Sequence, residues 1–310
     1  MSNTTSAFIS IVGRPNVGKS SLLNKVLGQK VAIVSDKPQT TRNRIMGVYT
    51  KENAQLVFID TPGFHKPKNV LGENMIMAVK SGLSDVDAVT LVVEAAPKFK
   101  LDLADLPPAE LELMSEISRR DLPAILAVNK IDLLPQKDAL LPIIHSYSQH
   151  CNFRAVVPIS AKTGDGLEEL IFEQLKFAKP SVHYFEDDTY SDVPDRVMVS
   201  EIIREKILRL FDKEIPHGVA VDIESFYERD NKNGEPVLEV GAVIYCEKDS
   251  HKGILIGKGG NMLKSVGSAA RVDIERFFGC KTNLKLWVKV KEGWRDKQGI
   301  IHSLGLDYQA

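Results

Sequence analysis

The stretch Gly13-Arg14-Pro15-Asn16-Val17-Gly18-Lys19-Ser20 fits the pattern GxxxxGK[ST]. It follows an apolar run at residues 8–12 and precedes a helical pattern at residues 21–27. Glycines let the backbone amides of such a loop turn inward, and the start of a helix adds the positive end of its dipole. Lys19 can then reach the terminal phosphates, and Ser20 can ligate Mg²⁺. The stretch therefore predicts a phosphate-binding loop between a strand and a helix.

The pattern around this loop extends to about residue 180. Short apolar runs alternate with longer amphipathic segments, which is typical of strands and crossover helices in a parallel sheet. We expect the strands at Phe8–Val12, Leu56–Ile59, Ala88–Val93, Ile125–Val128 and Val156–Ile159. The sequence therefore predicts an α/β domain over residues 1–180, with a mostly parallel sheet and helices on both faces.

Three further motifs each follow one of these strands: Asp60-Thr61-Pro62-Gly63, Asn129-Lys130-Ile131-Asp132 and Ser160-Ala161-Lys162. Asp60 is placed for a metal shell, and the bare N–H of Gly63 can approach a γ-phosphate. Asp132 can accept hydrogen bonds from N1–H and the 2-amino group of guanine, which adenine does not present together. The third motif would offer a backbone N–H to guanine O6. Taken alone, Asp60–Gly63 could be a common turn and Asn129–Asp132 a helix cap. All three motifs, however, follow the carboxyl ends of parallel strands, which is the edge of such a sheet where ligands bind.

The order and placement of these motifs resemble the translation-factor-related GTPases over residues 7–180. The resemblance implies that Lys37-Pro38-Gln39-Thr40-Thr41-Arg42 is switch I, with a threonine that closes over Mg²⁺ in the GTP state. We expect Thr41 in that role, with Thr40 as the alternative. Magnesium would then be held by Ser20, Thr41 and Asp60, and catalysis would depend on positioning by Lys19, Asn16, Thr41 and Gly63.

Phe64 departs from the pattern of many regulatory GTPases, which carry a water-orienting glutamine after the DxxG glycine. An apolar ring cannot orient water, so the sequence does not identify the group that orients the attacking water. The departure resembles a subgroup in which a P-loop asparagine helps to bind K⁺, and Asn16 occupies the matching position. We expect K⁺ to replace an arginine finger; the alternative is that Asn16 only fits the loop turn. Arg14, Arg42 and Arg44 are nearby alternatives to the cation, although basic residues in such segments are more often solvated or face partners.

A linker is expected at residues 181–195, where prolines and acidic residues replace the apolar periodicity. Beyond it, residues 196–211 carry a helical stripe, and residues 219–224 and 237–247 alternate like strands around a turn at 230–234. A strand-like run at 254–256, a helix to about residue 278 and a strand at 284–290 follow. The order αββααβ predicts a second, α+β domain over residues 196–310.

The second domain contains Ile256-Gly257-Lys258-Gly259-Gly260-Asn261, which has the GXXG setting of a KH domain. Met262 excludes a dinucleotide-binding GxGxxG, while a plain glycine-rich turn stays the alternative. The αββααβ order resembles the type II KH domain, which implies RNA binding at residues 256–260. Cations alternate along the last strand and continue into the basic C-terminal tail; they are Lys281, Lys285, Lys289, Lys291, Arg295 and Lys297. Trp287 could stack on a base, although Trp287 and Trp294 could equally be half-buried supports.

Composition excludes several other classes of protein. The 310 residues are 43% hydrophobic and 26% charged, as expected of a globular protein rather than a disordered one. No apolar run is long enough to span a bilayer, the N-terminus lacks a secretory signal, and the three cysteines have no paired spacing. The net charge of −1 hides an acidic segment at 181–250 and a basic one at 251–310. We expect a cytoplasmic protein, with the basic segment either facing a polyanion or merely solvated.

Over essentially its whole length the chain closely resembles the Era family of bacterial GTPases. The resemblance implies a GTP-switched factor that assists assembly of the 30S ribosomal subunit and binds the 3′ region of 16S rRNA through its KH domain. It also implies loose peripheral association with the inner membrane, and we expect a monomer. One alternative is a GTP-binding RNA scaffold with negligible intrinsic hydrolysis. Another is a membrane-trafficking or ion-transport GTPase without RNA affinity.

Overall fold

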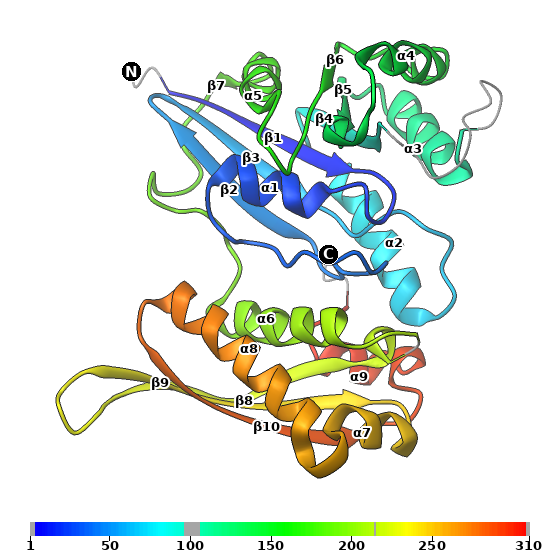
Figure 1. Cartoon of the computed structure of the whole chain (residues 1–310). Coiled ribbons are helices and arrows are strands. Elements are labelled where there is room, and N and C mark those ends of the chain that lie inside the picture. The colour runs from blue at the N-terminus through cyan, green and yellow to red at the C-terminus, as the bar shows by residue number, and fades with distance from the viewer. Residues whose placement is uncertain (1–3, 96–105, 214, 308–310) are drawn as a thin grey trace.

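The computed structural model describes residues 4–95, 106–213 and 215–307 and contains two sheets with their helices (Figure 1). The first sheet has the strand order β2-β3-β1-β4-β5-β6, and β7 pairs with the start of β1. Its strands are β1 (Thr5–Val12), β2 (Ile45–Lys51), β3 (Ala54–Asp60), β4 (Ala88–Glu94), β5 (Ala124–Asn129), β6 (Ala155–Pro158) and β7 (Lys179–Pro180). All five expected strands are present, each starting or ending within three residues of the predicted bounds.

The expected parallel sheet is confirmed for β3, β1, β4, β5 and β6. The sequence analysis missed β2, which pairs antiparallel with β3 at the edge of the sheet. Its residues, IMGVYTK, alternate only weakly between buried and exposed positions because it is an edge strand. The first sheet is therefore mixed at one edge and parallel in its centre.

Helices cover both faces of this sheet, as predicted. They are α1 (Lys19–Leu27), α2 (Val70–Gly82), α3 (Pro108–Arg119), α4 (Leu140–Ser148) and α5 (Leu167–Leu175), with short 3₁₀ turns η1 (Ile131–Leu133) and η2 (Lys137–Ala139). Apolar side chains of α1 and α5 pack in one core with Ile9, Ile11 and Phe58. Those of α2, α3 and α4 pack in a second core with Val12, Leu91 and Val93. Because successive side chains of a strand point to opposite faces, one buried strand serves both cores.

The second sheet has the order β10-β9-β8, with β8 and β9 antiparallel and β9 and β10 parallel. Its elements are α6 (Asp195–Leu210), η3 (Pro216–Gly218), β8 (Ala220–Asp230), β9 (Pro236–Cys246), α7 (Asp249–Ile256), η4 (Lys258–Gly260), α8 (Asn261–Phe278), β10 (Lys281–Val290), η5 (Trp294–Asp296) and α9 (Gln298–Ser303). The order αββααβ is confirmed. The expectation of a strand at 254–256 is wrong, because these residues end helix α7.

The segment after β7 does not hang free between the two sheets. The Gln55 side chain donates to the Phe185 carbonyl and accepts from the N–H groups of Tyr184 and Phe185. The ring of Tyr184 lies 4.9 Å from that of Phe8, measured between centroids. The segment expected to be a linker is therefore bound along the first sheet, and α6 begins inside its expected range, at Asp195.

Helix α6 lies between the two sheets and faces the segment that joins α1 to β2 (Figure 1). The side chain of Arg204 on α6 donates to the Thr40 carbonyl, and that of Arg209 donates to the Val34 carbonyl at 3.0 Å. None of the helices in the described ranges is long and apolar enough to cross a membrane.

Candidate functional site

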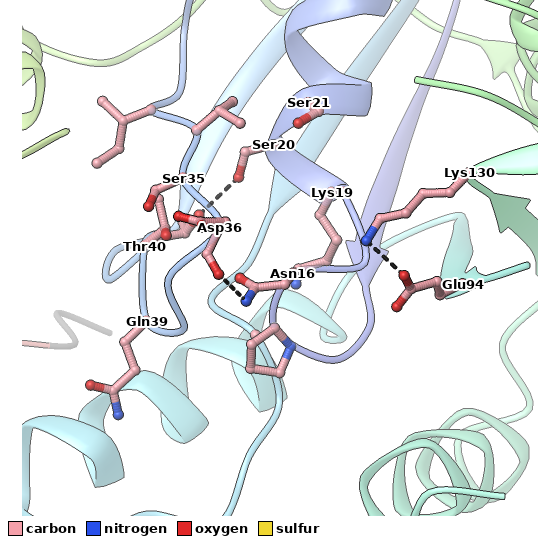
Figure 2. A pocket seen from close by; sticks show the side chains of 16 residues that line it. Asn16, Lys19, Ser20, Ser21, Ser35, Asp36, Gln39, Thr40, Glu94 and Lys130 are labelled. Atoms are coloured by element: carbon pink, nitrogen blue, oxygen red, sulfur yellow. Dashed lines mark hydrogen bonds and ion pairs between the residues drawn. The ribbon is translucent and has the colours of Figure 1, made fainter. Parts of the chain in front are cut away.

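The predicted phosphate loop connects β1 to α1 and borders a cavity of about 470 Å³ (Figure 2). A Cβ at Gly13 would lie 2.3 Å from the Val92 carbonyl oxygen, and one at Gly18, where φ is +101°, would lie 2.3 Å from Asn129 Nδ2. Both positions therefore require glycine. The Lys19 ammonium donates to the carbonyls of Gly13 at 3.1 Å and Arg14 at 3.0 Å, which curls the loop around it.

Lys19 is buried, and desolvation lowers its pKa to about 8, although the nearby charge of Asp60 acts in the opposite direction. A buried ammonium with only carbonyl partners is an incompletely satisfied cation. Phosphate oxygens entering this cavity would supply the missing negative charge. The electrostatics of the loop therefore favour a polyanion.

Three oxygen-bearing side chains meet beside Lys19. Ser20 Oγ donates to Asp60 Oδ2 at 2.7 Å and lies 2.8 Å from Thr41 Oγ1. Asp60 is fully buried, and within the described ranges its other oxygen, Oδ1, has no hydrogen-bond partner. Burial raises the pKa of Asp60 to about 6, although Lys19 lowers it. Hard oxygen ligands and an unsatisfied buried carboxylate oxygen fit Mg²⁺.

The two threonines of the switch segment differ in their contacts. Thr41 Oγ1 faces Ser20, whereas Thr40 Oγ1 donates to the Lys37 carbonyl at 2.6 Å, away from Ser20 and Asp60. This arrangement supports Thr41 rather than Thr40 as the magnesium ligand.

The other end of the site is organised by the buried amide of Asn129. Its Nδ2 donates to the Val17 carbonyl at 2.8 Å, and its Oδ1 accepts from the N–H groups of Lys130 at 2.8 Å and Ala161 at 2.9 Å. Of the motif Ser160-Ala161-Lys162, expected to offer a backbone N–H to guanine O6, the Ala161 N–H is therefore bonded to Asn129 in this structure. Asp132 is oriented by a contact that sequence reasoning missed, because Ser160 Oγ donates to its Oδ1 at 2.8 Å.

The predicted residues divide into those that line cavities and those that hold the lining in place. Beside the first cavity lie Pro15, Asn16, Gly18, Lys19, Ser20, Thr41, Gly63 and Lys130. A second cavity next to it is lined by Gly18, Asn129, Lys130, Asp132, Ala161 and Lys162. The supporting residues are Gly13, Arg14, Val17, Asp60, Thr61, Pro62, Ile131 and Ser160. Among these, Thr61 is buried and its hydroxyl donates to the Ile11 carbonyl at 3.0 Å.

The cavities also have lining residues that the motifs did not indicate. Ser35, Asp36 and Glu94 border the first cavity, where Figure 2 shows Glu94 facing Lys130 and Asp36 beside Asn16. The second cavity is lined by Glu205 and Arg209 of α6. Glu205 lies 175 residues after its partner Lys30, so no local pattern could have found it.

Two residues near the loop point away from the reacting phosphates. Phe64 donates its backbone N–H to the Gly13 carbonyl at 3.1 Å, and its ring is buried in the core beneath β4 and α3. Arg14 Nε donates to the buried carboxylate of Glu110 on α3 at 2.5 Å. Neither side chain is placed to orient water or to contact a γ-phosphate.

The glycine loop of the second domain lies between α7 and α8. Gly257, Gly259 and Gly260 have φ angles of +73°, +61° and +80°, and a Cβ at Gly257 would lie 2.6 Å from Met262 Cγ. Lys258 is exposed at the tip. A groove next to the loop is lined by Gly260, Leu263, Lys264, Gly267, Ser268, Arg271, Leu284 and Leu286. The cations Lys264 and Arg271 were missed, although their spacing of seven residues places them on one face of a helix.

The odd-numbered lysines of β10 are exposed on one side of the strand, whereas Lys291 follows the strand and is half-buried. Lys289 Nζ lies 2.9 Å from Glu224 Oε1, and Lys291 Nζ lies 4.4 Å from the centroid of the Tyr245 ring. Trp287 is 47% exposed, whereas Trp294 is fully buried and donates through Nε1 to the Gly218 carbonyl at 3.0 Å. Trp294 is therefore a core residue, and Trp287 alone could reach a ligand.

Comparison with known proteins matches both domains. A family described as 50S ribosome-binding GTPase matches residues 8–130, and a family described as KH domain matches residues 214–295. GTPase Era from Clostridioides difficile (strain 630) is 49% identical over 300 residues, covering 97% of this chain and 98% of the relative. GTPase Era from Staphylococcus haemolyticus (strain JCSC1435) is 44% identical over 305 residues, covering 98% of each.

Two solved structures resemble the whole chain. A crystal structure of an Aquifex aeolicus Era variant bound to GDP·AlF₄⁻ is 35% identical, with a TM-score of 0.91, and the match covers 98% of this chain and 100% of that one. Era in complex with MgGDPNP and nucleotides 1506–1542 of 16S ribosomal RNA is 34% identical, with the same TM-score of 0.91 and the same coverage.

The contacts of Asp132 lead to a prediction about base specificity. Asp132→Asn would replace the expected acceptor of guanine N1–H and N2–H with a group that can donate to the C2 carbonyl of xanthine. We expect GTP affinity to fall by about 100-fold or more and XTP affinity to rise, as in other sites that read polar groups. Isothermal titration with both nucleotides measures this. Unchanged GTP affinity would contradict the role of Asp132.

The pKa of Asp60 leads to a prediction about stability in the absence of nucleotide and metal. Because its pKa rises from 3.8 to about 6 on folding, this carboxyl stabilises the fold below pH 4, and that contribution is lost as the pH rises through 6. Ionised at pH 7.5, it costs roughly 3 kcal/mol. As the pH rises from 5 to 7.5, we therefore expect the free energy of unfolding of the wild type to fall relative to that of Asp60→Asn. Urea unfolding in chelator measures this, and a pH-independent difference would refute it.

Proposed function

The chain belongs to the GTPase Era family, and from that premise we propose that it is a GTP-hydrolysing switch that binds the 3′ region of 16S rRNA through its KH domain and assists assembly of the 30S ribosomal subunit. The observation that carries the proposal is the likeness, over 98% of this chain, to Era in complex with MgGDPNP and nucleotides 1506–1542 of 16S ribosomal RNA. The phosphate loop and the GXXG loop needed for both ligands are present in this chain.

Hydrolysis transfers the γ-phosphoryl group of GTP to water: a bond forms from the water oxygen to γ-phosphorus as the bond to the β–γ bridging oxygen breaks, which leaves GDP and inorganic phosphate. The loop amides and Lys19 would stabilise the charge that develops on the phosphate oxygens. Ser20, Thr41 and Asp60 would hold Mg²⁺, which supplies charge neutralisation at the β- and γ-phosphates when bound. Gly63 lies against the loop, since a Cβ there would come within 2.6 Å of the Pro15 nitrogen. Gly63 also lines the first cavity, and its N–H would approach the γ-phosphate there.

Potassium is the proposed substitute for an arginine finger. Asn16 has a φ of +66°, and its Nδ2 donates to the Asp36 carbonyl of the switch segment at 2.6 Å. With the nitrogen used in this contact, Oδ1 is the atom that would bind the cation beside the phosphates. The burial of Phe64 and the pairing of Arg14 with Glu110 support an external cation, because both side chains point elsewhere.

The switch segment is joined to the KH domain through Arg42. Its guanidinium is buried and donates to the carbonyls of Val219 at 2.7 Å and His217 at 3.0 Å, and it lies 5.6 Å from the centroid of the Trp294 ring. Desolvation lowers the pKa of Arg42 to about 9. Trp294 also packs in one cluster with Leu71 and Met75 of α2, the helix that follows Asp60–Gly63 in the chain.

The switch segment, through Arg42, and helix α2 therefore both pack against the same KH-domain tryptophan. A change in either segment would alter the packing between the domains and thereby the affinity for RNA. By thermodynamic reciprocity, RNA must change GTP affinity by the same factor.

Neither alternative function is favoured by a specific observation. Membership of a family of GTPases contradicts a scaffold without useful turnover, and the KH-domain match at residues 214–295 argues against a transport GTPase without RNA affinity. Peripheral association with the inner membrane and a monomeric state stay predictions of the family resemblance.

The RNA-binding role is tested at the glycine loop. In the double variant Gly259→Asp and Gly260→Asp, two carboxylates would repel RNA phosphates, and we expect affinity for the 1506–1542 segment to fall at least about tenfold. Fluorescence anisotropy with GTP analogue and with GDP measures it. Gly234→Asp is the matched control, because it also has a positive φ and open space but lies in the β8–β9 turn. RNA affinity that survives the double variant would refute the proposal.

The potassium role is tested with Asn16→Ala. We expect the wild type to hydrolyse GTP faster in K⁺ than in Na⁺, and the variant to lose this preference because no amide oxygen remains for the cation. Single-turnover rates in the two salts measure the ratio, and GDP affinity shows whether the loop is intact. A variant that keeps the wild-type ratio would overturn the assignment.

A further inference from the structure

The second cavity extends from the phosphate loop to the base motif and has a volume of about 890 Å³. Gly18 lies at its phosphate end, and Asn129 and Asp132 lie at its base end. A guanine nucleotide that occupies both ends must pass its ribose through the space between them. The same cavity is also lined by Lys30 and Val34 of the first domain and by Glu205 and Arg209 of α6.

We propose that α6 of the KH domain forms a wall of the nucleotide site and that Arg209, held in position by Glu205, contacts the ribose hydroxyls of bound GDP or GTP, which slows nucleotide release. This proposal rests on the GTPase activity of the family and not on RNA binding. It assigns to the KH domain a direct part in nucleotide binding.

Glu205 is the centre of the contacts between α6 and the first domain. Its side chain is 1% exposed. Oε1 accepts from Val34 N and Arg209 Nη2, both at 3.0 Å, and Oε2 accepts from Lys30 Nζ at 2.7 Å and Lys206 Nζ at 3.0 Å. A carboxylate held by four donors is rigid, because movement would leave a buried charge unpaired. The wall is therefore fixed in place rather than formed by a mobile surface side chain.

Arg209 closes the same contact from the other side. Its Nη2 donates to the Val34 carbonyl at 3.0 Å as well as to Glu205 Oε1. The side chain is 51% exposed and lines the cavity, so the remaining N–H donors of the guanidinium face solvent space that a ribose can occupy. The vicinal hydroxyls of a ribose can accept hydrogen bonds from these donors of Arg209.

The position of α6 also affects the exit path. Lys37 pairs with Asp212 just beyond α6, and Arg204 donates to the Thr40 carbonyl, so α6 and the residues after it are also attached to the switch segment beyond Val34. For nucleotide to leave past the ribose, these contacts must open or the nucleotide must slide along the wall. Weakening the wall should therefore accelerate release.

The test measures release of tritiated GDP from the full-length protein after addition of excess unlabelled GDP. A tritium label is chosen because a fluorophore on the ribose would disturb the contact under test. We expect Arg209→Ala to release GDP about tenfold faster than the wild type or more, the factor for one charge-assisted hydrogen bond, and Glu205→Gln to accelerate release through the weakened contact that positions Arg209. Arg276→Ala is the control: its side chain is 78% exposed and pairs with Asp273, but it does not line the cavity.

A second ligand separates ribose contact from general loosening of the interface. We expect 2′,3′-dideoxy-GDP to leave the wild type faster than GDP, and the two variants to lose most of this difference. The proposal would be overturned if the variants released both ligands faster by the same factor, or if both variants released GDP at the wild-type rate. It would also be overturned if Arg276→Ala accelerated release as much as the two variants. If Glu205→Gln fails to fold by circular dichroism, the half-exposed Arg209 variant decides alone.

Failure of this proposal would leave GTP hydrolysis and RNA binding untouched. By contrast, loss of RNA binding in the glycine-loop variant, measured separately, would not change the release rate of GDP expected here.

Discussion

The buried amide of Asn129 is the contact on which the arrangement of the nucleotide site depends. One side chain bonds the phosphate loop at Val17, the base motif at Lys130 and the following loop at Ala161. It also explains why position 18 has no side chain, since a Cβ there would collide with the amide nitrogen. Each of these backbone groups would cost about 1–3 kcal/mol if left buried and unpaired. Three loops from different parts of the sequence are thereby held in one register.

The phosphate end of the site is prepared for ligands at the expense of stability. A buried ammonium at Lys19 and a buried carboxylate at Asp60 both have pKa values displaced toward their neutral forms. Ligands that supply the opposite charges bind only the folded chain and so stabilise it by mass action. The same desolvation that makes the empty site unfavourable strengthens its hold on phosphate and metal.

The interface between the domains is built largely from ions rather than from apolar side chains alone. Arg42, Arg204 and Glu205 are buried there, each with oxygen or nitrogen partners from the other domain. Buried ion pairs contribute little net stability, because desolvation offsets most of their attraction, but they specify geometry strongly. Such an interface can define one relative placement of the domains and still separate when a ligand favours another. This property suits a switch whose two ligands bind different domains.

The phosphate loop, the five parallel strands, the αββααβ order and the family could all be predicted from the sequence. Each of these features is visible in patterns among residues that are close together in the chain. Local periodicity could not identify β2, whose pairing at a sheet edge leaves it half-polar, or separate the end of helix α7 from a strand at three apolar residues. Three contacts became visible only in the folded chain: the hydrogen bond from Ser160 to Asp132, the ion pair of Arg14 with Glu110, and the position of Glu205 beside the second cavity. The residues in these contacts are 28, 96 and 175 positions apart in the chain, the last being Glu205 and its partner Lys30. They arise from how folded elements pack, and hydrogen-bond satisfaction in a buried environment, rather than any local pattern, selects them.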